Sequence, residues 1–556
     1  MLTLAALLPL ALPLDAPALD YTVRVDDPAS ETVEVRLELS GLEGPLELSL
    51  PERFAYVQLE EPRLERGVFL EAPGDGELLR EGPFRWRLDP GSSPSATLSW
   101  RVPLDHRRLP AVAGRDEYEF PYLRDDHGLL VMGTLALAPA ELQPSAARVR
   151  FALPAGWEVH APWSAEADGS YELELSHLRD DLVAVGAWNA QVREVAGMQL
   201  TVAFAPGQED FAARVHERIA PIVAHQLELF GSTPQDAYLF LFGEPQAGGY
   251  GGSPKTQSMT LFVDPELPLD FALGGVEHLI AHEFHHTWQR ARCNPQPELR
   301  FVMEGFTDYY AWLSPWRLGT LEDAGLLEKL AELVAKYEQA QAESGLSLLE
   351  AGGPVFFEGG SAYRAVYAGG LTLALWLDLA LRQANPPSDL LSIVRALYED
   401  ERWRDGDARP GPEDLWRLVE QAAGADIAQT ARAWTQTAEM PALVERFGAL
   451  ELSIEREEVP AALDLRANMD GRTLVAIDPS DASALVGLRA GDELLRVNGV
   501  DVASEEDVRR AWGRLVDGRI QVRFRRAGEE RARAIDAARP AAYEYALPAE
   551  LLERLR

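Results

Sequence analysis

The 556-residue sequence contains a single cysteine, Cys293. A lone cysteine excludes an intramolecular disulfide and any zinc module built from several cysteines. Positive charge is also scarce, because 52 lysines and arginines stand against 89 aspartates and glutamates, which gives a formal net charge of −37. A nucleic-acid partner would require a basic surface that releases the counterions of the phosphates, so this balance argues against one. The excess of acid favours solubility, with a preference for cationic peptides as the alternative.

Long hydrophobic runs are missing after the N-terminus, so we expect no membrane span in the mature chain. The exception is MLTLAALLPLALPL, an apolar run of signal-peptide length, although no Lys or Arg precedes it. Ala16-Pro17-Ala18 then supplies small residues at the spacing of a cleavage site. We therefore interpret residues 1–18 as a signal peptide and expect a secreted or periplasmic protein. A buried first strand or a membrane anchor is the alternative.

The hydrophobic pattern of the rest of the chain predicts a multidomain α+β protein. Residues 19–195 alternate apolar and polar side chains in short runs separated by turn clusters, which predicts an N-terminal antiparallel β-rich domain. Residues 196–450 begin with strand and helix patterns and become mostly helical from residue 271, which predicts a mixed sheet followed by a helical bundle. Short strands return in residues 451–540, and residues 541–556 are expected to form a helical tail.

The segment HEFHH at residues 282–286 is the strongest chemical signal in the chain. Positions four apart share one face of a helix, so His282 and His286 can bind the same ion. Glu283 follows the first of them and can reach a water on that ion. The five-residue pattern is only moderately specific by itself, so its surroundings decide its meaning.

An acidic segment, EGFTDYY, begins at Glu304, and seventeen residues separate His286 from Glu304. A helix that starts there presents Glu304 and Asp308 on one face, one turn apart. Glu304 can complete a site of two histidines and one carboxylate with an open position for water, which suits catalytic zinc best. Asp308 can then accept the second N–H of a ligating histidine and fix its tautomer.

Two further histidines compete for the same role. His278 lies four residues before His282, but no glutamate follows it in the position of a base. His285 points about 100° away from His286 around the helix, so we expect it to pack against neighbouring side chains. Neither offers as complete a site as the first pair.

The segments HEFHHTW and EGFTDYY resemble the glycyl aminopeptidase family of gluzincin zinc metallopeptidases, which carry HEFxHxW and EGFT-like segments. The order of a β-rich domain, a thermolysin-like catalytic domain and a C-terminal PDZ domain is also similar. The resemblance implies that His282, His286 and Glu304 bind Zn²⁺, that Glu283 is the general base, and that Asp308 supports a zinc ligand. It also implies hydrolysis of peptide or protein substrates, with release of small N-terminal residues.

The same resemblance assigns a role to a tyrosine. Tyr367, in VYAGGLTLALWLD, falls where the related aminopeptidase N family has a YxKG segment whose tyrosine stabilises the oxyanion, although Gly369 replaces the lysine. A packing role for Tyr367 is the alternative, and Tyr309, Tyr310 and Tyr363 are the other candidates.

The family also has a YGGLEH-like segment beside the cleft, and this chain has Tyr250, Gly251 and Gly252 there, which we predict to bind substrate. The glycines allow a substrate to approach closely. No carboxylate follows them, and Lys255 cannot bind an ammonium group, so a metallo-endopeptidase is the alternative. We expect the next segment, SMTLFVD, to be an edge strand that pairs with extended substrate.

The C-terminal module resembles a PDZ domain through the segments GLRAGD, residues 487–492, and LRVNG, residues 495–499. An Asn-Gly pair between apolar runs predicts a tight hairpin. Such domains bind an extended peptide by adding a strand, and residues 469–473 are our candidate for the carboxylate-binding loop. A purely structural cap is the alternative for the module. For the whole chain, a non-catalytic peptide-binding protein with a structural zinc site is the alternative from another class.

Overall fold

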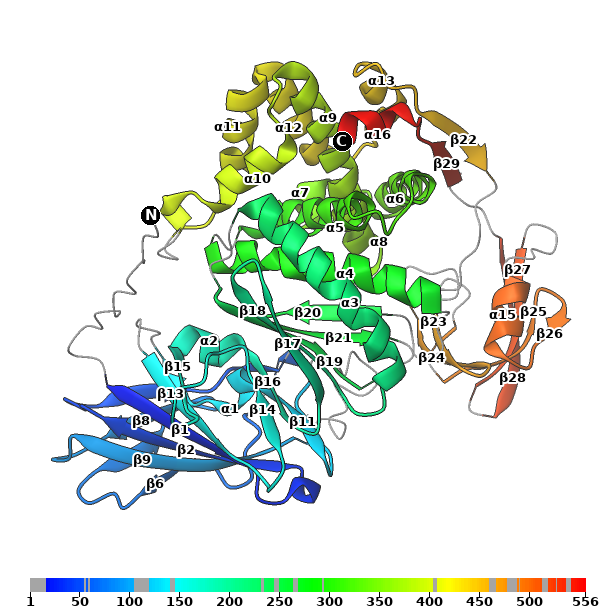
Figure 1. The fold of residues 1–556 in the computed structure, drawn as a ribbon. Helices are drawn as coiled ribbons and strands as arrows, with labels where there is room; N and C mark the ends of the chain where they lie inside the picture. Colours follow the sequence, from blue (N-terminus) through cyan, green and yellow to red (C-terminus); the bar gives the residue numbers. More distant parts are fainter. Residues whose placement is uncertain are drawn as a thin grey trace. The chain divides into compact units, whose positions relative to one another are not determined.

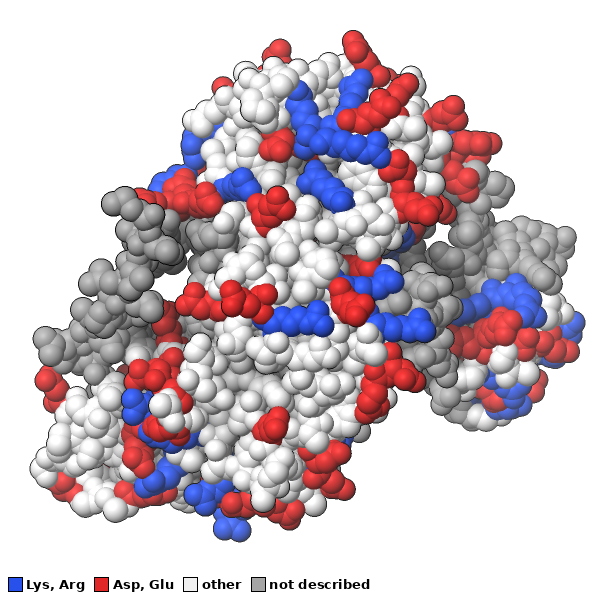
Figure 2. Space-filling model, viewed as in Figure 1, with Lys and Arg blue, Asp and Glu red and all other residues white. Residues whose placement is uncertain are grey.

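The computed structural model describes residues 17–556 with several gaps: 55–56, 59–60, 105–119, 141–145, 232–234, 245–249, 264–268, 293–294, 404–407, 460–466, 478–487, 490, 513–518, 527 and 537–541. Most of the predicted signal peptide and Cys293 therefore lie outside the described residues. The chain forms two compact units, Met1–Leu279 and Ile280–Arg556, which are described separately below. On the face drawn in Figure 2, acidic and basic side chains are interspersed.

The first unit begins with short strands, as the period-two pattern predicts (Figure 1). They are β1 (Ala18–Arg24), β2 (Thr32–Ser40), β3 (Leu46–Ser49), β4 (Arg53–Phe54), β5 (Val57–Gln58), β6 (Phe69–Glu71), β7 (Glu77–Arg80), β8 (Arg85–Asp89), β9 (Ser95–Pro103), β10 (Tyr122–Leu123), β11 (His127–Val131), β12 (Ala138–Pro139), β13 (Ala146–Ala152), β14 (Glu158–His160), β15 (Tyr171–Glu174) and β16 (Leu182–Gly186), with helices α1 (Met132–Leu135) and α2 (Leu175–Asp180). The main sheets have the orders β15-β13-β1-β2-β9-β6, β12-β3-β8-β7 and β10-β11-β16-β14.

These sheets share a core formed by the inward-facing residues of their strands, such as Val33, Val35 and Leu37 of β2. The expectation of a wholly antiparallel domain is wrong at one point, because β1 pairs with β13 in parallel. Alternation within a strand predicts which face is buried but not the direction of its neighbour. A partner from more than a hundred residues later is not constrained by a hairpin turn.

A five-stranded mixed sheet follows, with the order β17-β18-β19-β21-β20. Its strands are β17 (Asn189–Val195), β18 (Met198–Phe204), β19 (Ala237–Phe242), β20 (Tyr250–Pro254) and β21 (Ser258–Val263), and helix α3 (Glu209–Phe230) packs against β17 and β18. The edge position expected for SMTLFVD is wrong, since β21 lies between β19 and β20. Its almost continuous burial is typical of an interior strand, and β20 forms the edge instead.

Helices dominate the second unit, as the sequence pattern predicts. Helix α4 (Leu269–Arg292) leads into η4 (Pro297–Leu299), η5 (Phe301–Phe306), α5 (Thr307–Arg317), α6 (Asp323–Ser344), α7 (Leu348–Ala351), η6 (Pro354–Glu358), α8 (Gly360–Arg364), η7 (Ala365–Gly369), α9 (Gly370–Ala384), α10 (Leu390–Tyr398), η8 (Glu401–Trp403), α11 (Pro412–Ala423), α12 (Ala425–Gln436) and α13 (Leu443–Gly448). Among the described residues, one helical stretch, Gly360–Ala384, has the length and composition of a membrane span, but 89% of its apolar window is buried inside the protein. It forms the core of this helical region.

The C-terminal strands form two sheets, a larger one beside helix α15 (orange in Figure 1) and a separate pair. Their bounds are β22 (Glu455–Val459), β23 (Ala467–Asp470), β24 (Thr473–Ile477), β25 (Glu493–Val497), β26 (Val500–Asp501), β27 (Arg519–Arg526), β28 (Glu529–Asp536) and β29 (Ala542–Ala546), with helices α15 (Glu505–Trp512) and α16 (Glu550–Leu555). The predicted hairpin is confirmed, because Asn498 and Gly499 both have positive φ between β25 and β26.

The tail expected to be wholly helical begins with a strand, since β29 pairs with β22 before α16 starts. Tyr543 and Tyr545 explain the difference, because aromatic residues spaced two apart favour a strand. The hydroxyl of Tyr545 donates to Glu338 of α6 across 2.6 Å, and Arg456 of β22 pairs with the same carboxylate. The pair formed by β22 and β29, which precede and follow the sheet beside α15 in the sequence, is thereby attached to α6.

Candidate metal centre

The second half of α4 presents His282, Glu283 and His286, and all three side chains are buried. The imidazole rings of His282 and His286 lie 4.9 Å apart between centroids and are nearly perpendicular, at 79°. This follows from the four-residue spacing, which places the two rings one helical turn apart on one face. The predicted pair of histidines is therefore brought together.

Glu304 reaches this pair from η5, a π-helical turn that continues directly into α5. One of its carboxylate oxygens, Oε2, lies 3.5 Å from Nε2 of His282 and 3.7 Å from Nε2 of His286. Short π-helical turns are frequently found at functional sites. The sequence predicts an α-helix that carries Glu304, and the π-helical turn is the detail it does not predict.

These three side chains suit zinc. Their donor atoms all lie within 4.8 Å of one another. Tetrahedral bonds of about 2.0–2.1 Å separate neighbouring ligand atoms by roughly 3.3 Å, close to the spacing found here. Burial raises the pKa of Glu304, but the hydrogen bond from His282 and the charges of both imidazoles outweigh it and lower that pKa to about 2. Glu304 is therefore an anionic ligand throughout the neutral pH range.

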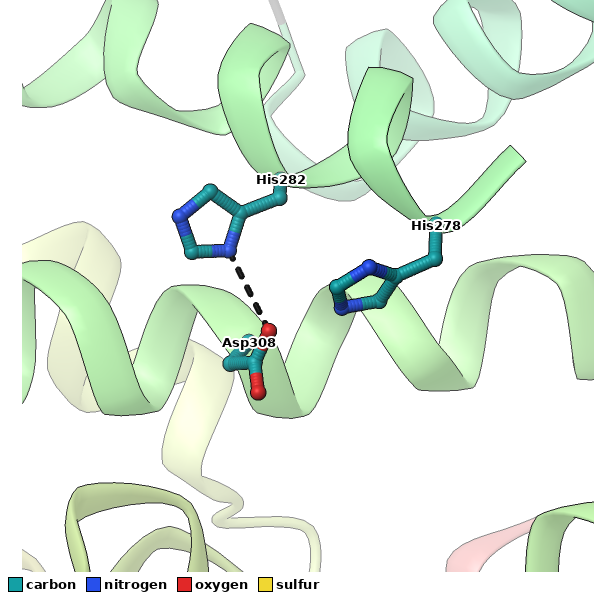
Figure 3. Close-up of side chains that lie close together, drawn as sticks. All are labelled: His278, His282 and Asp308. Atoms are coloured by element: carbon teal, nitrogen blue, oxygen red, sulfur yellow. Dashed lines mark ion pairs between the residues drawn. The ribbon is translucent and has the colours of Figure 1, made fainter. Parts of the chain in front are cut away.

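Asp308 lies one turn after Glu304 and faces the other nitrogen of His282. Its oxygen Oδ1 is 3.3 Å from Nδ1 of His282, the ion pair drawn in Figure 3. An imidazole held in this way directs Nε2 toward Glu304. His278 precedes His282 by one turn on α4 (Figure 3), but Glu304 lies beside His282 and His286, so the carboxylate completes the predicted pair.

Gln289 is a residue of this site that the sequence interpretation missed. Its side-chain oxygen lies 2.7 Å from Nδ1 of His286. Gln289 follows His286 by three positions, so it shares a helix face with the ligand. A polar residue at that spacing in a buried helix is the signal that points to it.

Tyr367 lies in η7, a second π-helical turn, just before α9. Its ring stacks against His282 at 5.7 Å and 18°, and its hydroxyl donates to the Glu304 carboxylate. Burial and the charge of Glu304 raise the pKa of Tyr367 well above its ordinary value, so the phenol stays protonated. Tyr363 lies beside it, with the ring centroids 4.5 Å apart.

The other tyrosine candidates for the oxyanion role, and the competing His285, contact other residues. The hydroxyl of Tyr309 donates to Asp378 across 2.8 Å. Tyr310 stacks on His285 at 5.7 Å, and His285 is completely buried among aromatic rings. Burial, together with the charges of His286 and His282, lowers the pKa of His285 well below its ordinary value. A neutral packing role for His285 agrees with the sequence interpretation.

The predicted substrate-binding residues Tyr250, Gly251 and Gly252 form the first part of the edge strand β20 in the first unit. A β-carbon on Gly251 would lie 2.5 Å from the Phe262 ring, so a larger residue there would displace that ring. The ammonium group of Lys255 lies 3.3 Å from Oγ of Ser253. A cation therefore directly follows the last residue of β20.

Two histidines and a glutamate, with a glutamate directly after the first histidine, define a zinc metallopeptidase of the HExxH type. This protein is such an enzyme. Residues 276–353, which carry all three ligands, match the family model of the M61 glycyl aminopeptidases, so the resemblance predicted from the two motifs is confirmed over this segment. Among the curated proteins, none matches the chain.

Solved structures support the fold over a longer stretch. An aminopeptidase N family protein from Idiomarina loihiensis is similar over 96% of this chain and 99% of its own, with 18% identity and a TM-score of 0.79. An M1 zinc metallopeptidase from Deinococcus radiodurans is similar over 77% of this chain and 95% of its own, with 15% identity and a TM-score of 0.50. At these identities the likeness concerns the fold alone.

Proposed function

We propose that this zinc metallopeptidase releases small residues from the free amino termini of peptides. The observation that carries the proposal is the match of residues 276–353 to the glycyl aminopeptidase family. Strand β20 adds support, because an extended peptide can pair with the edge of a sheet. In this proposal the backbone of Tyr250, Gly251 and Gly252 binds the peptide.

The proposed mechanism assigns one task to each side chain. His282, His286 and Glu304 would hold the zinc, which would supply a Lewis acid for the scissile carbonyl and for the attacking water. Glu283 takes a proton from that water and delivers it to the leaving amine. The Tyr367 hydroxyl donates a hydrogen bond to the oxyanion, a charge that exists only in the transition state and the intermediate that follows it.

A metallo-endopeptidase is the second candidate, and Lys255 is the observation that favours it. The ammonium group of a peptide would need an acidic partner, and Lys255 carries the same sign of charge. Without an acidic partner, electrostatics would not favour binding of a free amino terminus over binding of an internal segment of the peptide. Internal cleavage would then follow from the same catalytic groups.

Cleavage of a peptide library by the purified protein decides between these functions. Each peptide is offered with a free and with an acetylated amino terminus, and zinc is quantified on the same sample. Release of single small residues from free termini only supports the aminopeptidase. Equal cleavage of the acetylated peptides would establish the endopeptidase instead. Bound zinc with no cleavage at all would point to a non-catalytic peptide-binding protein.

We also propose that residues 451–540 form a PDZ domain that binds a peptide ligand and that the protein is exported. The Asn498-Gly499 hairpin and the sheet beside α15 support the first of these. Binding of C-terminal peptides to the full chain, measured by fluorescence anisotropy, tests the PDZ assignment. Fractionation of expressing cells, with N-terminal sequencing of the mature protein, tests the signal peptide.

A further inference from the structure

The amide of Gln289 connects a zinc ligand to three other segments of the second unit. Its oxygen Oε1 lies 2.7 Å from Nδ1 of His286. Its nitrogen Nε2 lies 2.8 Å from Oγ1 of Thr307, 2.8 Å from the hydroxyl of Tyr398 and 3.1 Å from the carbonyl oxygen of Met303. The side chain is only 1% exposed, so these contacts are not shared with bulk water. One amide thus links α4 to η5, α5 and α10.

The surrounding groups determine which way this amide faces. The carbonyl of Met303 only accepts hydrogen bonds, so it requires the nitrogen of Gln289. The hydroxyl of Thr307 donates to the same carbonyl across 2.6 Å, so its oxygen is left to accept from Gln289 as well. The amide oxygen must therefore face His286, and only an N–H can fill that contact. Nδ1 of His286 therefore carries a proton and is occupied by Gln289, which leaves Nε2, on the side of Glu304, as the nitrogen that can bind zinc.

We propose that Gln289 is a positioning residue that fixes the tautomer and orientation of His286 for zinc binding. The two histidines are then held by different partners, because Asp308 is a carboxylate and Gln289 is a neutral amide. A carboxylate partner raises the basicity of a ligating imidazole. Glu283, Glu304 and Asp308 already surround the site with negative charge. A neutral partner therefore orients His286 without further reducing the Lewis acidity that zinc would supply there.

This proposal rests on the zinc peptidase site and not on the choice between aminopeptidase and endopeptidase. Its test is therefore a metal-binding measurement that needs no substrate. The dissociation constant for zinc is measured in Gln289→Met by competition with a chromogenic chelator. We expect binding weaker by about 10–100-fold, the usual effect of removing the partner of a ligating histidine. The absorption spectrum of the cobalt-substituted protein should change as well, because the ring of His286 is no longer held.

Gln341 supplies a matched control. It is also a buried glutamine, 2% exposed, and its nitrogen donates to the carbonyls of Leu346 and Ala438 at 2.7 and 2.8 Å. Gln341→Met should lower stability in a comparable way and leave zinc affinity and the cobalt spectrum unchanged. If the two variants bind zinc equally well, the proposal is overturned.

A conservative variant separates positioning from packing. Gln289→Glu keeps an oxygen that accepts from His286 but loses the N–H that the Met303 carbonyl requires, so zinc affinity should recover only part of the loss seen in Gln289→Met, while kcat falls because of the added negative charge. Tyr398→Phe provides a milder perturbation if Gln289→Met does not fold, because it removes one acceptor that orients the amide. We expect it to weaken zinc binding about threefold, as for one neutral hydrogen bond, and unchanged affinity would contradict the proposal.

Discussion

The carboxylate of Asp308 lies 3.3 Å from Nδ1 of His282, although the two residues belong to different helices, α5 and α4. The two side chains stabilise each other. The carboxylate holds the imidazole in one orientation, and the imidazole gives a buried carboxylate the cationic partner that burial requires. Zinc affinity should depend on this contact even though Asp308 does not bind the metal.

Replacement of Asp308 tests that dependence. Asp308→Ala should weaken zinc binding by about 10–100-fold, measured by chelator competition. Asp308→Asn should lose less, because its amide oxygen still accepts from Nδ1 but carries no charge. Equal losses in the two variants would show that charge, not the hydrogen bond, is the whole effect. Parental affinity in Asp308→Ala would contradict the role assigned to this residue.

Replacement of Glu283 separates metal binding from proton transfer. Glu283→Gln has nearly the same shape but cannot accept a proton, so kcat should fall by about 10²–10⁴-fold. Zinc content, measured by atomic emission on the same preparation, should stay at the parental level. Undiminished turnover in this variant would contradict the general-base assignment.

Tyr367 and Tyr363 form a natural pair for testing the oxyanion assignment, since their rings lie 4.5 Å apart. Removal of one oxyanion donor costs about 10²–10³-fold in kcat, and Tyr367→Phe should lose that much with little change in KM. Tyr363→Phe should lose far less, because the proposed mechanism assigns the hydrogen bond to the oxyanion to Tyr367, whose hydroxyl contacts the predicted metal ligand Glu304. A larger loss in Tyr363→Phe would transfer the oxyanion role to that residue.

The metal ligands could be predicted from the sequence because helix geometry is a local property. Four-residue spacing is sufficient to pair His282 with His286, and the same periodicity places Glu304 and Asp308 on one face. Only the meeting of the two helices depends on tertiary structure. The known pairing of these motifs in one family supplies that information.

The features that the sequence did not predict depend on contacts between distant segments. Tyr398 is more than a hundred residues from Gln289, so the hydrogen bond between them leaves no local pattern. The parallel pairing of β1 with β13 and the pairing of β22 with β29 are of the same kind. Alternation predicts that a segment is a strand, but the choice of neighbour is decided by the global fold.

The stability of the metal-free protein should depend on pH through His282 and Glu304. Burial lowers the pKa of His282, but Asp308 and Glu304 outweigh it and raise that pKa from 6.5 to about 10. A raised folded-state pKa stabilises the fold below pH 6.5, and this contribution is lost between pH 6.5 and about 10. The pKa of Glu304 is lowered from 4.5 to about 2, so its contribution is present above pH 4.5 and lost below it.

Zinc should remove the alkaline half of this dependence, because the metal replaces the proton on the imidazole. The difference in Tm between zinc-loaded and chelator-treated protein should therefore widen as pH rises from 6.5 toward 10. Differential scanning fluorimetry across that window provides the measurement. In the metal-free Glu304→Gln variant the fall in Tm should be shallower, since an uncharged partner raises the pKa of His282 less. A constant difference in Tm would contradict the ion pair.

Gly370 should be as important for the metal site as residues that lie closer to it. A β-carbon on Gly370 would lie 2.3 Å from the carbonyl oxygen of Phe301, and one on Gly305 would lie 2.4 Å from the α-carbon of Gly370. The start of α9 can therefore approach η5 only because both positions are glycine. Since η5 also carries Glu304, any separation of these backbones moves a metal ligand.

Gly370→Ala should accordingly destabilise the protein by about 1–3 kcal/mol and weaken zinc binding, measured by urea unfolding and chelator competition. Gly274 of α4 is the matched control, because a β-carbon there meets no atom within 4 Å. Alanine is the better helix former, so Gly274→Ala should raise stability by up to about 1 kcal/mol and leave zinc affinity unchanged. If Gly370→Ala unfolds like the parent and binds zinc as tightly, the close contact between η5 and α9 does not position Glu304.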